Sequence, residues 1–478
     1  MSNNPTQASV CIIGAGLGGS LLAIYLARQG YQVEVYERRP DMRKEPVERG
    51  RSINMTLAAR GLQALDNVGL LESVIDQTTP LKGRMIHAID GARTFQPYGK
   101  NKDEVIHSIV RNKLNIKLLD AAEELPNVKL FFNHRCLNID KESGTAHLRD
   151  EKNSRSTTIN PSFIIGADGA FSTVRQQMHK GMRAYYQQEF LDWGYKELHI
   201  PSGVGSGLIE DNALHIWPRG DFMLLAMPNR DQSVTCACIL PFEGDPSFGS
   251  LKTEKQIIDF FKEQFPDALP LMPNLVEDFH HNPIVEMITT STHPWHYKNR
   301  IVLIGDACHA VVPFYGQGMN AAFEDCVVLT ECITNAGGDL EAGFAQYQEL
   351  RKKHTDALAK LSKDNFVELR KRSQSPMFVA RKKIEVALNR LFPQAWMPLY
   401  TMVTHTTIPY AEALDRLHRR NRIARYFGID LLLLLVAGLM VVGRLLGFDN
   451  LRNRRDRFRP LPFRRPLIAP LTKSDRQN

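Results

Sequence analysis

A strand, a glycine-rich turn and a helix at the start of the chain constrain the fold more than any other feature. Residues 10–13 form an apolar run typical of a buried parallel strand, and Gly14, Gly16 and Gly19 follow it. The first glycine permits a tight turn, the second lets backbone N–H groups approach a pyrophosphate, and the third lets helix and strand pack closely. The helix predicted over residues 20–29 points its positive N-terminus at that pyrophosphate. The segment therefore predicts a dinucleotide-binding turn.

An acid follows the second strand of this unit at the expected place. Residues 32–36 predict the strand, and Glu37 comes 23 residues after Gly14. A carboxylate there can accept hydrogen bonds from a ribose hydroxyl. Both FAD and NAD are bound by such units, so the segment alone leaves the choice between them open.

Composition narrows the class of protein. With 478 residues, 43% hydrophobic and 23% charged, the chain is expected to form two or three globular domains. Its seven cysteines include no CxxC pair, which argues against a metal site and favours a reducing compartment. Cys236 and Cys238 lie two apart in a predicted strand and are interpreted as packing residues. The polar N-terminus is unlike a secretory signal, so a cytoplasmic location is expected.

Two later segments repeat the strand-to-turn pattern. Residues 162–166 predict a buried strand that runs into Asp168 and Gly169, then into a helix capped near Ser172. Taken alone, this is equally an ordinary strand-to-helix turn. Residues 300–304 predict a third buried strand, which ends at the pair Gly305–Asp306.

The loop after Asp306 has the composition of a ligand-binding loop. It contains Gly316 and Gly318 and enters a helix near Met319, so backbone amides and a helix N-terminus could approach a flat, negatively charged ligand such as reduced flavin. We interpret His309, in the same segment, as a residue that hydrogen-bonds the backbone rather than as a catalytic group.

Residues 83–98 predict a hairpin with its turn at Asp90–Gly91, which places Arg84 and Tyr98 near its open end. Residues 214–240 contain three further predicted strands, and an antiparallel sheet of this kind can cover a pocket. Residues 339–425 read as charged helices. The local sequence pattern alone predicts that Asn365 is a surface residue and that Tyr400 is an aromatic residue packed in the core.

The C-terminal part combines an apolar run with a basic tail. Residues 431–442 are apolar or small, but Asp430 and Arg444 interrupt the longer stretch 426–448, so its length is marginal for a spanning helix. We expect this stretch to contact a membrane because both of its flanks are basic. Whether it spans the membrane, lies on the membrane surface or is buried as an ordinary helix stays open. Residues 449–478 hold eight Arg and one Lys against three Asp, or +6 of the net +8, without the aromatic interleaving that would indicate nucleic-acid binding.

The three turns, in this order, resemble the single-component FAD-dependent aromatic hydroxylases. The runs at residues 49–54, 84–87, 97–99, 215–218, 314–321 and 398–404 are similar to the members that hydroxylate kynurenine, and the likeness covers residues 9–425. It implies an α/β fold with a Rossmann-like FAD-binding domain, an inserted mixed or antiparallel sheet that forms the substrate domain, and a C-terminal helical region. The implied FAD-binding domain consists of residues 1–183 and 295–340, and its 83–98 hairpin contributes to the substrate pocket. The sheet of the substrate domain lies between these parts, at residues 184–294. The helical region follows at 341–425, the membrane anchor at 426–448 and the basic tail at 449–478.

The resemblance also implies a role for individual residues. The positions matching FAD contacts are Gly14, Gly16, Gly18, Gly19, Tyr36, Glu37, Arg38, Arg39, Thr56, Arg111, Cys136, Asp168, Thr173, Asp306, Gly318, Met319 and Asn320. The positions matching contacts to L-kynurenine are Arg84, Tyr98, Asn365 and Tyr400, with Phe314 and Tyr315 facing the ring. An arginine at position 84 can take the substrate carboxylate as a bidentate ion pair.

The implied chemistry needs FAD as the bound cofactor, NADPH as a transient co-substrate and O2. NADPH reduces FAD, oxygen adds as a C4a-hydroperoxide, and the substrate ring receives one oxygen atom to give 3-hydroxy-L-kynurenine, a step of tryptophan degradation and NAD synthesis. No second GxGxxG exists, so NADPH is expected to dock transiently, and Asp168 is one candidate residue for that docking. Two alternatives stay open: a hydroxylase of another aromatic acid, and a membrane adaptor that binds FAD without turnover.

Overall fold

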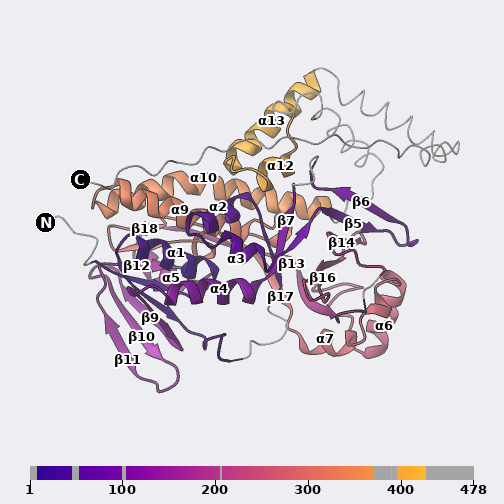
Figure 1. The fold of residues 1–478 in the computed structure, drawn as a ribbon, viewed down its shortest axis with the longest axis horizontal. Coiled ribbons are helices and arrows are strands. Elements are labelled where there is room, and N and C mark those ends of the chain that lie inside the picture. The colour runs from indigo at the N-terminus through magenta and orange to yellow at the C-terminus, as the bar shows by residue number, and fades with distance from the viewer. Residues whose placement is uncertain are drawn as a thin grey trace, which may run out of the picture.

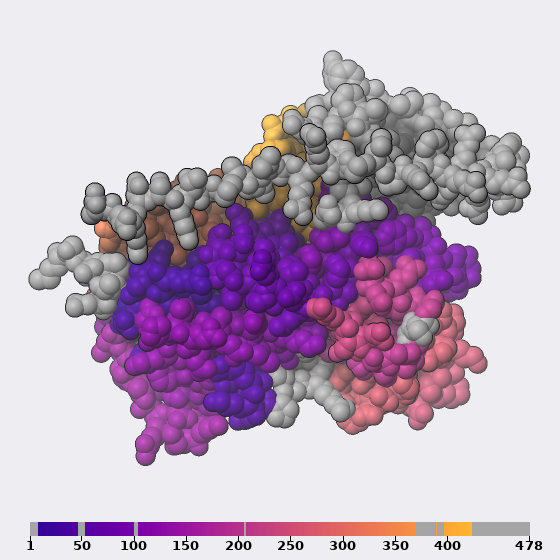
Figure 2. Space-filling model, viewed as in Figure 1, coloured from indigo at the N-terminus to yellow at the C-terminus, as the bar shows by residue number. Residues whose placement is uncertain are grey.

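The computed structural model describes residues 8–45, 53–99, 104–204, 207–369, 389 and 396–426. Two lobes lie side by side, and a group of helices covers them along one side (Figure 1). In the space-filling view the indigo and purple lobe from the first part of the chain adjoins the pink lobe from its middle (Figure 2). The predicted fold class, an α/β FAD-binding domain with an inserted sheet and C-terminal helices, is confirmed.

The first lobe is built on a six-stranded sheet in the order β18-β19-β12-β1-β2-β8. The pairs β19/β12, β12/β1, β1/β2 and β2/β8 are parallel, and only β18 is antiparallel to its neighbour. All three apolar runs predicted as buried strands are therefore adjacent in it. The strands are β1 (Ser9–Ile13), β2 (Gln32–Glu37), β8 (Val128–Phe132), β12 (Phe163–Gly166), β18 (His296–Tyr297) and β19 (Ile301–Leu303).

Two small antiparallel sheets flank this lobe. One is a meander, β11-β10-β9, and the other has the order β3-β7-β4. Their strands are β3 (Asn54–Leu57), β4 (Thr79–Leu81), β7 (Ile106–Val110), β9 (His134–Asp140), β10 (Thr145–Asp150) and β11 (Ser156–Ile159).

The second lobe is a seven-stranded mixed sheet in the order β17-β13-β16-β15-β14-β5-β6. The predicted hairpin forms as β5 and β6, and it joins the edge of the sheet by a parallel pairing of β5 with β14. The hairpin thus brings Arg84 from the first part of the chain into the second lobe. The strands are β5 (Gly83–His87), β6 (Arg93–Pro97), β13 (Tyr185–Ile200), β14 (Ala213–Pro218), β15 (Met223–Pro228), β16 (Val234–Pro241) and β17 (Val285–His293). As predicted, Cys236 and Cys238 are both buried packing residues of this sheet.

Helices cover both lobes, and α10 runs along one side of the molecule above the first sheet (Figure 1). The helices α2 and α3 are separated by Gly69, which has a positive φ of 61°. The helices are α1 (Leu17–Arg28), α2 (Ala59–Asn67), α3 (Leu71–Ile75), α4 (Arg111–Glu123), α5 (Thr173–His179), α6 (Glu254–Gln264), α7 (Leu275–His281), α8 (Asp306–His309), α9 (Gly318–Asn335), α10 (Leu340–Val367), α12 (Leu399–Thr404) and α13 (Tyr410–Tyr426), with 3-10 turns η2 (Leu269–Leu271) and η3 (Pro313–Tyr315).

The apolar segment at 427–448 and the basic tail at 449–478 lie outside the described residues. Among the helices that are described, none is both long enough and apolar enough to cross a bilayer.

Candidate active site

The β1–α1 turn has the close packing that its glycines predict. Gly14 has a φ of 107°, and a Cβ atom there would lie 2.4 Å from the carbonyl oxygen of Ala167 on the neighbouring turn. A Cβ atom on Gly19 would lie 2.0 Å from the Gly14 carbonyl oxygen. Only glycine lets the helix approach the strand this closely.

Gly16 is different, because a Cβ atom built on it meets no atom within 4 Å in the described part of the protein. It is the N-cap of α1 with an extended backbone, so its side of the turn is open space at the helix N-terminus. Beside it, Glu37 accepts hydrogen bonds from Ala15 N and Arg39 N, both at 3.0 Å. An open helix N-terminus next to a fixed carboxylate fits the pyrophosphate and ribose of a dinucleotide.

The structure brings the other predicted turns to the same edge of the sheet. Because β2, β1, β12 and β19 are parallel neighbours, their C-terminal ends carry Glu37, Gly14, Asp168 and Asp306 side by side. Ligands of open α/β sheets bind at this edge. The candidate cofactor residues on the flanking elements are Arg38 and Arg39 after β2, Thr56 on β3, Arg111 at the start of α4, Cys136 on β9 and Thr173 at the start of α5.

Tyr36 and Asp168 are candidate residues whose side chains interact within the protein. Tyr36 is buried and stacks on Phe131 with ring centroids 4.7 Å apart, while its carbonyl accepts the Gly14 amide at 2.8 Å. Asp168 accepts hydrogen bonds from Ser172 Oγ and Val174 N, and burial raises the pKa of this carboxyl while those bonds oppose the shift. Asp168 therefore holds the start of α5, where Ser172 is the N-cap as predicted.

Asn320 is fully buried at the start of α9, close to Gly318 and Met319. Its Nδ2 donates to the carbonyls of Thr56 and Gly316 at 2.8 and 2.9 Å, and its Oδ1 accepts from Ala58 N at 2.9 Å. Asn320 thus ties β3 to the loop before α9 and fixes the shape of the cofactor side of the site.

Arg84 and three tyrosines form a contiguous group on the other side. The rings of Tyr98 and Tyr400 stack at 4.9 Å, and Tyr315 stacks on Tyr400 at 5.9 Å. The Arg84 Cζ lies 5.5 Å from the Tyr98 ring and 5.0 Å from the Tyr400 ring. Within the described residues, the buried Nε of Arg84 has no hydrogen-bond partner. A buried guanidinium N–H without an acceptor fits a ligand carboxylate.

Asn365 and Phe314 join this group from α10 and η3. Asn365 is 7% exposed and donates from Nδ2 to the Phe314 carbonyl at 2.7 Å. The Phe314 ring stacks on Phe366 at 4.2 Å, and Phe314 precedes Tyr315 in the chain. All six candidate substrate residues are thus neighbours in one group. Phe366 was not predicted from the sequence; its position next to Asn365 is the only signal that could have pointed to it.

His309 has a different partner from the one predicted. Its Nε2 lies 2.5 Å from Asp325 Oδ2, a side chain rather than the backbone, and the same oxygen accepts the Gly305 amide at 3.0 Å. Burial alone would lower the pKa of His309, but Asp325 and Cys308 raise it well above its ordinary value. Asp325 Oδ1 also accepts from Arg351 Nε at 2.7 Å. This buried acid was missed because, in sequence, it looks like an ordinary helix-surface charge.

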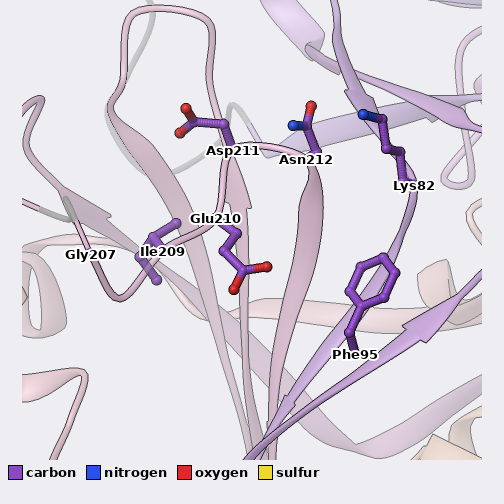
Figure 3. A pocket seen from close by; sticks show the side chains of 7 residues that line it. All are labelled: Lys82, Phe95, Gly207, Ile209, Glu210, Asp211 and Asn212. Carbon is purple, nitrogen blue, oxygen red and sulfur yellow. The ribbon is translucent and has the colours of Figure 1, made fainter. Parts of the chain in front are cut away.

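A surface hollow of about 550 Å³ lies beside the hairpin, lined by Lys82, Phe95, Gly207 and residues 209–212 (Figure 3). It contains none of the six residues of the Arg84 group. Its lining carries acids at Glu210 and Asp211, which would repel a carboxylate, so we do not assign the substrate to it.

Comparison with known proteins gives both a family and a fold. Residues 7–362 match the FAD binding domain family. The chain is 48% identical over 432 residues to a kynurenine 3-monooxygenase of Salinispora arenicola, covering 90% of this chain and 95% of that protein. It is 42% identical over 417 residues to a kynurenine 3-monooxygenase of Dictyostelium discoideum, covering 84% and 89%. In three dimensions it resembles 2-methyl-3-hydroxypyridine-5-carboxylic acid oxygenase, with a TM-score of 0.63, 21% identity, and coverage of 77% of this chain and 94% of that one.

Proposed function

The chain belongs to the kynurenine 3-monooxygenase family, and we propose that it hydroxylates L-kynurenine at ring carbon 3, using FAD, NADPH and O2. The observation that carries the substrate assignment is Arg84, whose buried Nε has no acceptor among the described residues and lies beside two stacked tyrosines. L-Kynurenine has the carboxylate that such a group needs at one end and an aromatic ring at the other.

We assign the amino-acid end of the substrate to Arg84, Tyr98 and Asn365. Arg84 is surrounded by protein, which disfavours its charge, yet Tyr98, Tyr400 and the carboxylate of Glu368 raise the pKa of the guanidinium above its ordinary value. It therefore meets the substrate as a cation. Tyr98 can donate its hydroxyl to the same carboxylate, while Tyr400 closes over it.

The aromatic ring is assigned to the surface formed by Phe314 and Tyr315. Both residues are 8% exposed, and Asn365 fixes the Phe314 carbonyl from α10. A rigid aromatic wall orients a flat substrate and excludes water from the reacting carbon.

The cofactor is assigned to the edge formed by Gly14, Gly16, Glu37 and Asp306. The open space at Gly16 and the fixed carboxylate of Glu37 fit its pyrophosphate and ribose. FAD bound there supplies the redox chemistry, taking electrons from NADPH and activating O2. Residues 316–320 follow the aromatic wall in the chain, and the Asn320 side chain donates to the Gly316 carbonyl; we assign this segment to the junction between the cofactor and the substrate ring.

The function is tested by NADPH oxidation with purified, FAD-loaded full-length protein, with and without L-kynurenine. We expect faster oxidation when kynurenine is present, with 3-hydroxykynurenine formed. Faster oxidation that yields only hydrogen peroxide would make kynurenine an effector and another aromatic acid the substrate. An unchanged rate would favour the FAD-binding adaptor.

We also propose that residues 426–448, with their basic flanks, attach the enzyme to a membrane from the cytoplasmic side. The support is the composition alone: apolar residues at 431–442 followed by a tail of net charge +6. Cosedimentation with anionic vesicles measures it. Full-length protein is expected to pellet and a chain ending at residue 425 to stay in solution; equal behaviour of the two would contradict the proposal.

A further inference from the structure

A buried arginine outside the Arg84 group holds the segment between α12 and α13. Arg60, on α2, is 2% exposed and donates from Nη1 to the carbonyls of Val403 at 2.8 Å and Thr406 at 3.1 Å. Its Nη2 donates to the carbonyl of Ile408. The guanidinium also lies over the Tyr410 ring, with Cζ 3.9 Å from the ring centroid. One side chain thus engages three carbonyls of a single turn, where a helix C-terminus leaves acceptors unsatisfied.

The same arginine begins a chain of paired charges, in which Glu324 is half-buried and the other members are buried. Arg60 Nε lies 3.1 Å from Glu324 Oε2 on α9, and that oxygen is also 2.5 Å from Arg351 Nη1 on α10. Arg351 pairs in turn with Asp325, which accepts the amide of Gly305. We call Arg60, Glu324, Arg351 and Asp325 the Arg60 chain. Each of its two anions lies between two cationic groups, because His309 also pairs with Asp325, and this pairing lets the charges remain in the interior.

The two ends of the Arg60 chain lie at the two halves of the active site. At one end, α12 carries Tyr400, which stacks on Tyr98 and lies beside Arg84. At the other end, Gly305 precedes Asp306 at the cofactor edge. The carbonyls that Arg60 holds begin only three residues after Tyr400, so loss of this contact would free the segment that closes the substrate pocket.

We propose that Arg60 is a positioning residue that docks α12, and with it Tyr400, over the substrate, and that the Arg60 chain couples this closure to the turn at Gly305 on the cofactor side. The proposal rests on the proposed function, because it takes L-kynurenine as the molecule beneath Tyr400. Arg60 itself touches neither substrate nor cofactor in this assignment.

The test compares three variants of the full-length, FAD-loaded enzyme. Arg60→Met keeps the aliphatic stem and removes all the donors, whereas Arg60→Lys keeps the charge and one donor group. Arg416→Gln is the matched control, since Arg416 lies on α13 and pairs only with exposed Glu412 among the described residues. Two quantities are measured: amide hydrogen exchange over residues 399–413 without substrate, and KM and kcat for L-kynurenine.

For Arg60→Met we expect about tenfold faster exchange over 399–413 and about a tenfold rise in KM, because only the docked fraction binds substrate. The kcat at saturating substrate should stay within about twofold, since substrate binding restores docking. Arg60→Lys should fall between the wild type and Arg60→Met, and Arg416→Gln should match the wild type.

Unchanged exchange and KM in Arg60→Met would overturn the proposal. So would an exchange increase spread evenly over α2 and α9 with KM unchanged, since that marks a purely stabilising residue. If Arg60→Met does not fold, a wild-type KM in Arg60→Lys would overturn it. A wild-type enzyme without any response to kynurenine would refute the proposed function, while the substrate-free exchange would still decide whether Arg60 docks α12.

Discussion

Arg84→Met is expected to weaken L-kynurenine binding by about 100-fold or more while FAD stays bound. The variant keeps most of the side-chain volume but removes the charge and every donor. A charge-assisted bond to a carboxylate in a water-excluded site contributes about 3 kcal/mol, which corresponds to that factor. The buried Nε of Arg84 has no acceptor among the described residues, so the substitution removes no hydrogen bond of that atom within the described protein. Titration of the flavin absorbance with kynurenine measures the affinity.

Arg93→Met is the matched control for this variant. Arg93 belongs to the same hairpin and is exposed, and its side chain donates hydrogen bonds to the carbonyls of Gly207 and Leu208 at 3.4 and 3.3 Å. It should bind kynurenine like the wild type. An Arg84→Met variant with normal affinity would show that the carboxylate is held elsewhere and that the Arg84 group is not the substrate site.

Alanine substitutions at two glycines of the same motif should affect different properties, FAD binding in one case and stability in the other. Gly16→Ala should leave the folded protein intact and weaken FAD binding by about 10- to 100-fold, because its methyl group enters space that only the pyrophosphate would fill. Gly19→Ala should lose about 3 kcal/mol or more of stability, because its methyl group would lie 2.0 Å from the Gly14 carbonyl oxygen.

The two effects are separated by urea unfolding of the FAD-free proteins and by fluorescence titration with FAD. We expect an unchanged unfolding midpoint for Gly16→Ala and a lowered one for Gly19→Ala. Wild-type FAD affinity in Gly16→Ala would place the pyrophosphate away from the N-terminus of α1.

Local sequence signals predicted the elements that carry the site. The apolar runs at 10–13, 163–166 and 301–303 became adjacent parallel strands because each is buried on both faces, and this adjacency brings their turns to one edge. The hairpin at 83–98 formed as predicted, since its Asp–Gly turn and alternation are short-range features. Its parallel pairing with β14 needs contacts more than 100 residues apart, so no local pattern could show it.

Local sequence patterns do not reveal which polar residues on the helices are buried. Asn365 looks like a surface residue in a charged helix, but α10 packs it against η3, and only the family resemblance pointed to its role. No feature of the sequence indicated that Arg60, Glu324 and Asp325 pair with other charges inside the protein. Arg60 and Glu324 lie 264 positions apart in the chain, and a pairing of that kind appears only once the chain is folded.

The most direct test of the central claim follows labelled oxygen from O2 into the product. Purified enzyme is supplied with FAD, NADPH, L-kynurenine and ¹⁸O2, and the product is analysed by mass spectrometry and chromatography against 3-hydroxykynurenine. The account predicts one ¹⁸O atom on the aromatic ring, with NADPH consumed in equal amount. NADPH consumption with hydrogen peroxide as the sole product, or an oxygen atom derived from water, would contradict it.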